Sequence, residues 1–214
     1  MNNLTYDDIM TTHSITENDH TFNQTNETDT TFDNEFLPSS ENKINLACTN
    51  ARSLAQKIGS LVTLFDENSL HIAMLTETSL TPKNSPPRVL SDLLHGGNIA
   101  LIRRDRGSRG GGVAIAFNPE KGNFKKYGVN NGDKKSEIVA AVGNIKATKR
   151  KIVSIATYLP PSLSAADTST AISTLIDLID RAKTDYVDPI LFVGGDFNGK
   201  DMSRLLSSLS LIHI

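Results

Sequence analysis

Short apolar runs divided by polar turn residues follow one another from Lys43 onward. Their length and their β-branched and aromatic content predict strands, which fall at 44–49, 71–75, 98–104, 112–117, 136–146, 150–158 and 190–193. A short basic turn, 147–151, joins two of these runs and predicts a hairpin.

Two further segments repeat apolar residues at helical spacing. The first spans about 53–68, and the second ends near Tyr186. Their apolar faces consist of Leu54, Ile58, Leu61, Val62 and Phe65 in the first, and of Ala171, Ile172, Leu175, Ile176 and Ile179 in the second. Because a strand precedes and follows the first helix, we expect a parallel strand pair with a crossover helix. Crossovers combined with a hairpin predict an α/β layered fold with a mixed sheet, while 85–97 fits a loop or a single helical turn.

Residues 1–41 differ from the rest of the chain. They show no sustained periodicity and contain nine acids without any Lys or Arg, so we expect a disordered acidic tail. The remainder of the 214 residues fits one domain and holds 15 of the 24 acids against all 22 bases. A basic globular part is compatible with a polyanionic partner but does not identify one.

The single Cys48 cannot form an internal disulfide, and its apolar neighbours predict a buried thiol. A reducing, intracellular location fits this usage. No stretch approaches the roughly 20 apolar residues that span a bilayer, and the N-terminus lacks a secretory signal, so no membrane partner is expected.

Polar side chains end several of the predicted strands. They are Asn50, Glu77, Tyr158, and the pair Asp196 and Asn198 within the motif GGDFN. Ligands collect at the carboxyl ends of strands in α/β sheets, and Mg²⁺ prefers carboxylate oxygens, which Glu77 and Asp196 could supply. Such residues are also common wherever strands turn, so their spacing alone predicts only an anion or metal site.

Four arginines, Arg103, Arg104, Arg106 and Arg109, precede three consecutive glycines. Guanidinium groups suit contacts with DNA phosphates, whereas a solvated charge run is an equally good interpretation.

Five segments, taken in order, carry a family resemblance: INLACTNARSL, IAMLTET, RRDRGSRGGGVAIAF, VSIATYLPPS and ILFVGGDFNGKD. Over about residues 43–203 the chain resembles the endonuclease/exonuclease/phosphatase superfamily. It is most similar to the apurinic-like endonuclease domain of non-LTR retrotransposons. The resemblance implies a DNase I-like, four-layered αββα sandwich with mixed sheets.

The same resemblance implies roles for the polar strand ends. Glu77 matches the principal metal-binding acid, and Asn50 matches an Asn near the end of the first strand. Tyr158 is similar to the tyrosine that holds the phosphate. Asp196 is similar to the acid that orients or deprotonates the attacking water, and Asn198 to the amide that positions that water and the phosphate. The implied cofactor is Mg²⁺ or Mn²⁺.

The implied function is hydrolysis of phosphodiester bonds, with DNA nicked so that a downstream reverse transcriptase can prime. A nuclear location follows if the parent element is intact. Alternatives are a repair endonuclease, a phosphoinositide phosphatase, or a module that binds nucleic acid without catalysis.

The chain departs from the family pattern after GDFN. The family continues with a later Asp and a Ser-Asp-His run, and none of the five histidines here matches that run. Residues 42–208 are therefore expected to be the N-terminal part of the domain, incomplete at the C-terminus and inactive as a fragment. The last six residues, 209–214, match a translated sequencing adapter, and an ordinary apolar terminus is the alternative.

Overall fold

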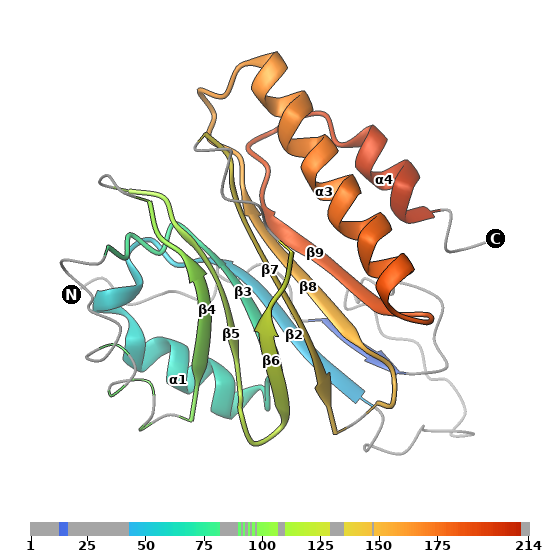
Figure 1. Ribbon diagram of the computed structural model, residues 1–214. Coiled ribbons are helices and arrows are strands. Elements are labelled where there is room, and N and C mark those ends of the chain that lie inside the picture. The colour runs from blue at the N-terminus through green and yellow to red at the C-terminus, as the bar shows by residue number, and fades with distance from the viewer. Residues whose placement is uncertain are drawn as a thin grey trace, which may run out of the picture.

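The computed structural model describes residues 13–16, 43–81, 90, 92, 94, 96, 98–106, 110–128, 135–146 and 148–210. Two β-sheets pack face to face (Figure 1). The first has the order β1-β2-β3-β5-β4, with strands β1 (His13–Thr16), β2 (Lys43–Asn50), β3 (Ile72–Thr76), β4 (Ala100–Arg104) and β5 (Val113–Phe117). The second has the order β6-β7-β8-β9, with strands β6 (Gly122–Lys126), β7 (Glu137–Ile145), β8 (Ile152–Tyr158) and β9 (Ile190–Asp196).

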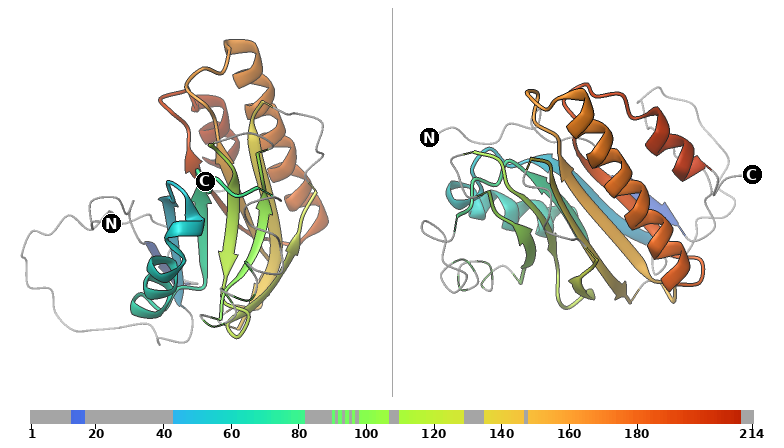
Figure 2. Two further views of the ribbon diagram at one scale, coloured as in Figure 1. Left: turned by 90° about the vertical axis from the view of Figure 1, so that its left-hand side faces the viewer. Right: turned by 45° about the horizontal axis from the view of Figure 1, so that its top comes forward.

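Helices cover the outer face of each sheet (Figure 2). The short 3-10 helix η3 (Leu54–Gln56) and α1 (Ile58–Glu67) belong to the first sheet, and α3 (Ala165–Asp185) and α4 (Ser203–Ser210) belong to the second. Leu61 and Phe65 of α1 pack on the first sheet, and Leu175 of α3 packs on the second. The chain therefore forms four layers in the order αββα, which confirms the fold class.

The inner core lies between the sheets. Ile115 and Val139, both fully buried, represent the facing sides of β5 and β7. Coverage of both faces explains why every residue of β3, β5 and β8 is buried and why these strands are mostly apolar instead of alternating strictly with polar residues. No helix within the described residues is long and apolar enough to cross a bilayer.

Two parallel pairs bring four strand ends to one edge of the sandwich. In the first sheet Asn50 pairs with Thr76, and in the second Tyr158 pairs with Asp196. The predicted parallel pair joined by a crossover helix is confirmed. The predicted hairpin is also confirmed, because β7 runs antiparallel to β8 and sets Glu137 opposite Tyr158.

The structure differs from the sequence predictions in three places. The helix expected over 53–68 is split into η3 and α1 at Lys57, whose backbone angles of φ −126° and ψ 20° are not helical. Strand β6 was not predicted, since GNFKK buries only Gly122 and Phe124 along an edge. Helix α4 was not predicted either.

The expected disordered tail needs a correction at His13–Thr16, which pair antiparallel with β2 as β1. The rest of 1–42 lies outside the described residues, as do most of 85–97 and all of 211–214. Leu209 and Ser210, the first two residues of the adapter-like ending, belong to α4.

Candidate active site

Two predicted residues come from the first sheet. Asn50 ends β2 and accepts a hydrogen bond at Oδ1 from the backbone N–H of Arg52, with a distance of 3.1 Å. Glu77 follows β3 and has φ 49°, in the left-handed region that a residue with a Cβ rarely occupies. Side chains alternate between the two faces along β3, so a regular continuation of the strand would point Glu77 to the outer face. The left-handed turn changes that direction.

Backbone hydrogen bonds hold Glu77 in that conformation. The Ser53 N–H donates to the Glu77 carbonyl at 3.0 Å, and the Thr78 N–H donates to the Gly112 carbonyl at 3.1 Å. The turn that carries Glu77 is therefore fixed from two sides, by the segment after β2 and by the glycines before β5.

Three predicted residues come from the second sheet. Tyr158 and Asp196 are direct neighbours in the register of β8 and β9, and Leu159 donates its N–H to the Asp196 carbonyl at 2.9 Å. Asn198 donates from its backbone to Asp196 Oδ1 at 3.0 Å and from Nδ2 to the Leu159 carbonyl at 2.9 Å. The loops after β8 and β9 are thus tied together at the site.

Electrostatic interactions link the two sheets. Burial raises the pKa of the Tyr158 hydroxyl, and the carboxylates of Glu77, Asp196 and Glu137 raise it further, against the guanidinium of Arg106. Both Glu77 of the first sheet and Asp196 of the second therefore lie close enough to Tyr158 to affect its ionisation. The structure brings these predicted residues together at one end of the sandwich.

Glu137 is a residue of this site that the sequence analysis missed. It is only 3% exposed, it accepts a hydrogen bond at Oε2 from the Gly112 N–H, and its Oε1 lies 3.1 Å from Nε of Arg106. Burial raises its pKa despite these two contacts, and the like charge of Glu77 adds to the rise. The available signal is a lone acid directly before the apolar run IVAAV, near the start of the strand predicted over 136–146.

The glycines before β5 make room for this network. A Cβ on Gly111 would lie 2.6 Å from Glu137 Oε1, and one on Gly112 would lie 2.5 Å from Thr78 Oγ1. Both residues also have left-handed backbones, with φ 69° and 89°. Only glycine satisfies both conditions without strain.

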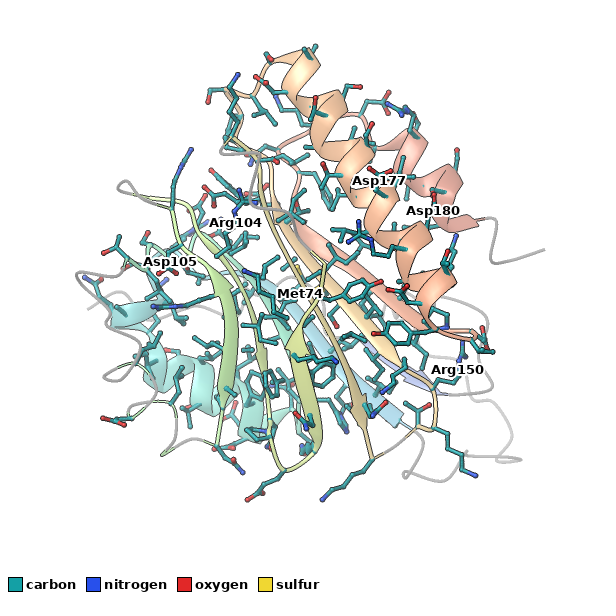
Figure 3. The ribbon with its side chains drawn as sticks, in the orientation of Figure 1. Met74, Arg104, Asp105, Arg150, Asp177 and Asp180 are labelled. Carbon is teal, nitrogen blue, oxygen red and sulfur yellow. The ribbon has the colours of Figure 1, made fainter. Side chains whose placement is uncertain are left out.

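The predicted arginines make contacts within the protein. Arg103 pairs with Asp105 at 3.3 Å, and Arg104 donates from Nη1 to the Ile138 carbonyl at 3.4 Å. Figure 3 shows Arg104 and Asp105 near the same end of β4, with Met74 between the two sheets. Arg106 pairs with Glu137, and Arg109 lies outside the described residues.

The oxygen groups of Glu77, Asp196 and Asn50 suit a hard divalent cation. No group of three or more His, Cys, Asp or Glu side chains capable of holding a metal occurs among the described residues. Mg²⁺ does not require one, because it is commonly bound by one or two carboxylates with water and substrate phosphate. His71, the one histidine whose side chain the structure describes, lies at the opposite end of β3, where Nδ1 accepts from the Asn45 N–H at 3.1 Å.

Comparisons with known proteins agree with this architecture. The model of the Endonuclease/Exonuclease/phosphatase family matches residues 44–210. The catalytic domain of human Nocturnin has a TM-score of 0.54 at 14% identity, over 78% of this chain and 68% of that one. A mannosyl-6-phosphatase of Bacteroides thetaiotaomicron has a TM-score of 0.54 at 12% identity, over 79% and 70%.

The endonuclease domain of TRAS1, a telomere-specific non-LTR retrotransposon, has a TM-score of 0.50 at 16% identity, over 78% of this chain and 71% of that one. A comparison with curated proteins finds no significant match. At these identities the structural likeness establishes the fold alone.

Proposed function

The chain belongs to the endonuclease/exonuclease/phosphatase family, whose members are hydrolases of phosphodiester bonds or phosphate esters, and on this premise we propose that its site serves metal-dependent DNA nicking. One observation carries the proposal. Glu77 and Asp196, from different sheets, both lie close enough to the hydroxyl of Tyr158 to affect its ionisation. Carboxylates from two sheets around one phenol match the needs of a phosphodiester substrate with a divalent cation.

The cation would be Mg²⁺ or Mn²⁺, held by Glu77 with Asp196, and when bound it would neutralise charge on the phosphate and the leaving oxygen. Tyr158 donates a hydrogen bond to the phosphate, since its raised pKa keeps the hydroxyl protonated at neutral pH. Asp196 accepts a proton from the attacking water. Asn198 and Asn50 orient the water and the phosphate with their side-chain amides.

Asn198 is already oriented for such a role. Its Nδ2 donates to Leu159, the residue after Tyr158, and its backbone N–H contacts Asp196. Lys200 strengthens the arrangement by donating from Nζ to the carbonyls of Pro161 and Leu163 at 2.9 and 3.0 Å. The groups that would handle water and phosphate are therefore held by one hydrogen-bonded pair of loops.

We place the protein in the retrotransposon branch of the family, as the endonuclease domain ahead of a reverse transcriptase, acting in the nucleus. Support comes from the RRDRGSRGGG segment, from the basic balance of residues 42–214 and from the likeness to the TRAS1 endonuclease domain. The likeness to a mannosyl-6-phosphatase gives the second candidate, a phosphatase acting on a small phosphate ester.

Nicking of supercoiled plasmid tests the proposal. It is measured for the 214-residue chain and for the same chain extended by the C-terminal strands of a related family member, because residues 42–208 are expected from the sequence to be inactive alone. In the extended chain we expect Mg²⁺- or Mn²⁺-dependent conversion to the open circle, abolished by chelator and restored by added metal. Glu77→Ala should lower the rate at least about a hundredfold. Glu120→Ala is the matched control, because Glu120 is exposed in the turn between β5 and β6, away from the site.

Metal binding is measured in parallel by Mn²⁺ paramagnetic resonance, and sugar-phosphate hydrolysis by phosphate release. Equal nicking by wild type and Glu77→Ala contradicts the proposal. Binding of Mn²⁺ and DNA without nicking favours the non-catalytic module, and phosphate release without nicking favours the phosphatase.

A further inference from the structure

Arg106 differs from the other described arginines in how its guanidinium is held. Its Nε lies 3.1 Å from Glu137 Oε1, and Glu137 is itself fixed by the Gly112 N–H. A Cβ on Gly111 would lie 2.8 Å from Arg106 Cδ and 3.0 Å from Nη1. The side chain therefore packs over a position that only a glycine leaves open, and a buried carboxylate sets its orientation.

The guanidinium also remains reachable from solvent. The Arg106 side chain is 35% exposed, whereas that of Glu137 is 5% exposed. Within the described part of the chain, Glu137 contacts Arg106 at Nε, and the guanidinium carries four further N–H groups on Nη1 and Nη2 that suit phosphate oxygens. The charge acts on Tyr158, which places it at the same end of the sandwich as the candidate site.

We propose that Arg106 is a phosphate-binding residue of the nucleic-acid substrate, oriented by Glu137, and that it contacts a backbone phosphate beside the reacting one. The proposal rests on the function proposed above and specifies its substrate as a chain with more than one phosphate. A guanidinium suits this contact because its planar fork donates two parallel hydrogen bonds to phosphate oxygens.

Arg103 and Arg104 do not offer the same geometry. The Arg103 side chain is 15% exposed and pairs with Asp105, and Arg104 donates to a backbone carbonyl of β7. Both contacts bind the end of β4 to the protein itself. Of the three described arginines that the sequence nominated for DNA contact, Arg106 is therefore the one that we assign to the substrate.

The test is a charge-neutral double variant, Arg106→Gln with Glu137→Gln, which avoids leaving an unpaired buried charge. Its matched control is Arg150→Gln with Asp188→Asn. That pair lies 2.9 Å apart, its arginine is 30% exposed, and Figure 3 shows Arg150 at the opposite end of the sheets from Arg104. Both doubles remove one base and one acid, so net charge is unchanged in each.

Binding of a short fluorescent DNA duplex is measured by anisotropy over a range of salt concentrations in chelator. Turnover is therefore absent, and the result can be interpreted even if the hydrolysis proposal fails. We expect the Arg106 double to bind about tenfold more weakly and to lose about one unit of the salt slope, while the control binds like wild type. Circular dichroism confirms that both doubles are folded.

Arg106→Lys provides a second test that keeps the charge. The single ammonium of lysine cannot bind Glu137 and a phosphate together with the geometry of a guanidinium. We therefore expect weaker DNA binding with an unchanged melting temperature. Wild-type affinity in both Arg106 variants overturns the proposal. An equal loss in the Arg150 control also overturns it, because the effect would then belong to general electrostatics.

Discussion

Glu137 connects parts of the site that are distant in the sequence. Its carboxylate contacts Gly112 before β5 and Arg106 after β4, and Gly112 in turn accepts a hydrogen bond from Thr78, directly after Glu77. A nearly unexposed acid is tolerated here because a backbone donor and a guanidinium both offset its desolvation. The conformation of the turn that carries Glu77 thus depends on a residue of the other sheet.

Stability should respond to pH through this carboxyl. The folded-state pKa of Glu137 lies above its ordinary value of 4.5, mainly because of burial. Below that ordinary value the carboxyl group is protonated in both the folded and the unfolded chain, so folding buries no charge at Glu137. As pH rises through the raised folded-state pKa, the unfolded chain is already ionised, and the folded protein loses stability.

Glu137→Gln should remove this loss. Urea unfolding of both proteins at several values between about pH 4 and pH 8 gives the comparison. We expect the unfolding free energy of wild type to fall relative to the variant as pH increases. A difference that stays constant over the range, or grows in the opposite direction, contradicts a raised pKa for Glu137.

Sequence reasoning reached Asn50, Glu77, Tyr158 and Asp196 because each follows an apolar run, and the intervening helices indicate parallel strands with a common end. It could not reach Glu137 in the same way, since this residue begins an antiparallel strand. Its position at the site depends on the register of the β7–β8 hairpin, which places it opposite Tyr158. Register is a property of strand pairing and is not visible in one segment.

At the scale of the element, β9 shows why two glycines precede Asp196. Gly194 faces the inner core, where a Cβ would meet the flexible end of Met74 at 2.7 Å and Cys48 Sγ at 3.2 Å. Gly195 has φ 150°, and its Cβ would collide with the backbone carbonyl of Thr157 on β8. The first glycine allows the sheets to approach, and the second allows the strands to pair.

These two positions should tolerate alanine very differently. Gly194→Ala should cost about 1 kcal/mol or less, since Met74 can move its terminal methyl. Gly195→Ala should cost roughly 3 kcal/mol or more, because a backbone carbonyl cannot give way and the conformation disfavours any Cβ. Chemical denaturation of the two variants measures the difference. Similar losses in both would show that the strand, and not the specific contact, sets the cost.

Cys48 of β2 lies at the same contact between β2 and β9. Burial raises the pKa of its thiol to about 11, while a hydrogen bond with the Gly195 backbone opposes the rise. The thiol is therefore neutral at physiological pH and packs against the inner core as a small apolar group, although Cys48 is partly buried and not fully buried as the sequence predicted. Strand β6 was harder to predict, because its lysines suit an exposed edge and leave little hydrophobic pattern.

At the scale of the whole molecule, periodicity predicted an α/β layered fold but not the number of layers. The strands β3 and β5 have both faces buried, since one face meets α1 and the other meets the second sheet. A continuous apolar run indicates burial on both sides without identifying what covers each side. The four-layered arrangement was therefore expected from the family resemblance and not from hydrophobic pattern.

The left-handed conformation of Glu77 lowers the stability of the whole molecule at a position that carries a candidate metal ligand. A residue with a Cβ at φ 49° costs of order 1 kcal/mol or more, and the Glu77 carboxylate also repels that of Glu137. Glu77→Gly should therefore melt at a higher temperature than wild type, with an unfolding free energy greater by about 1 kcal/mol, although it lacks the acid that we propose as a metal ligand. Calorimetry measures this directly, and a lower melting temperature would show that the turn is unstrained. Selection for thermal robustness alone would favour glycine at this position, so a carboxylate there is what a compromise between folding and the proposed metal site would produce.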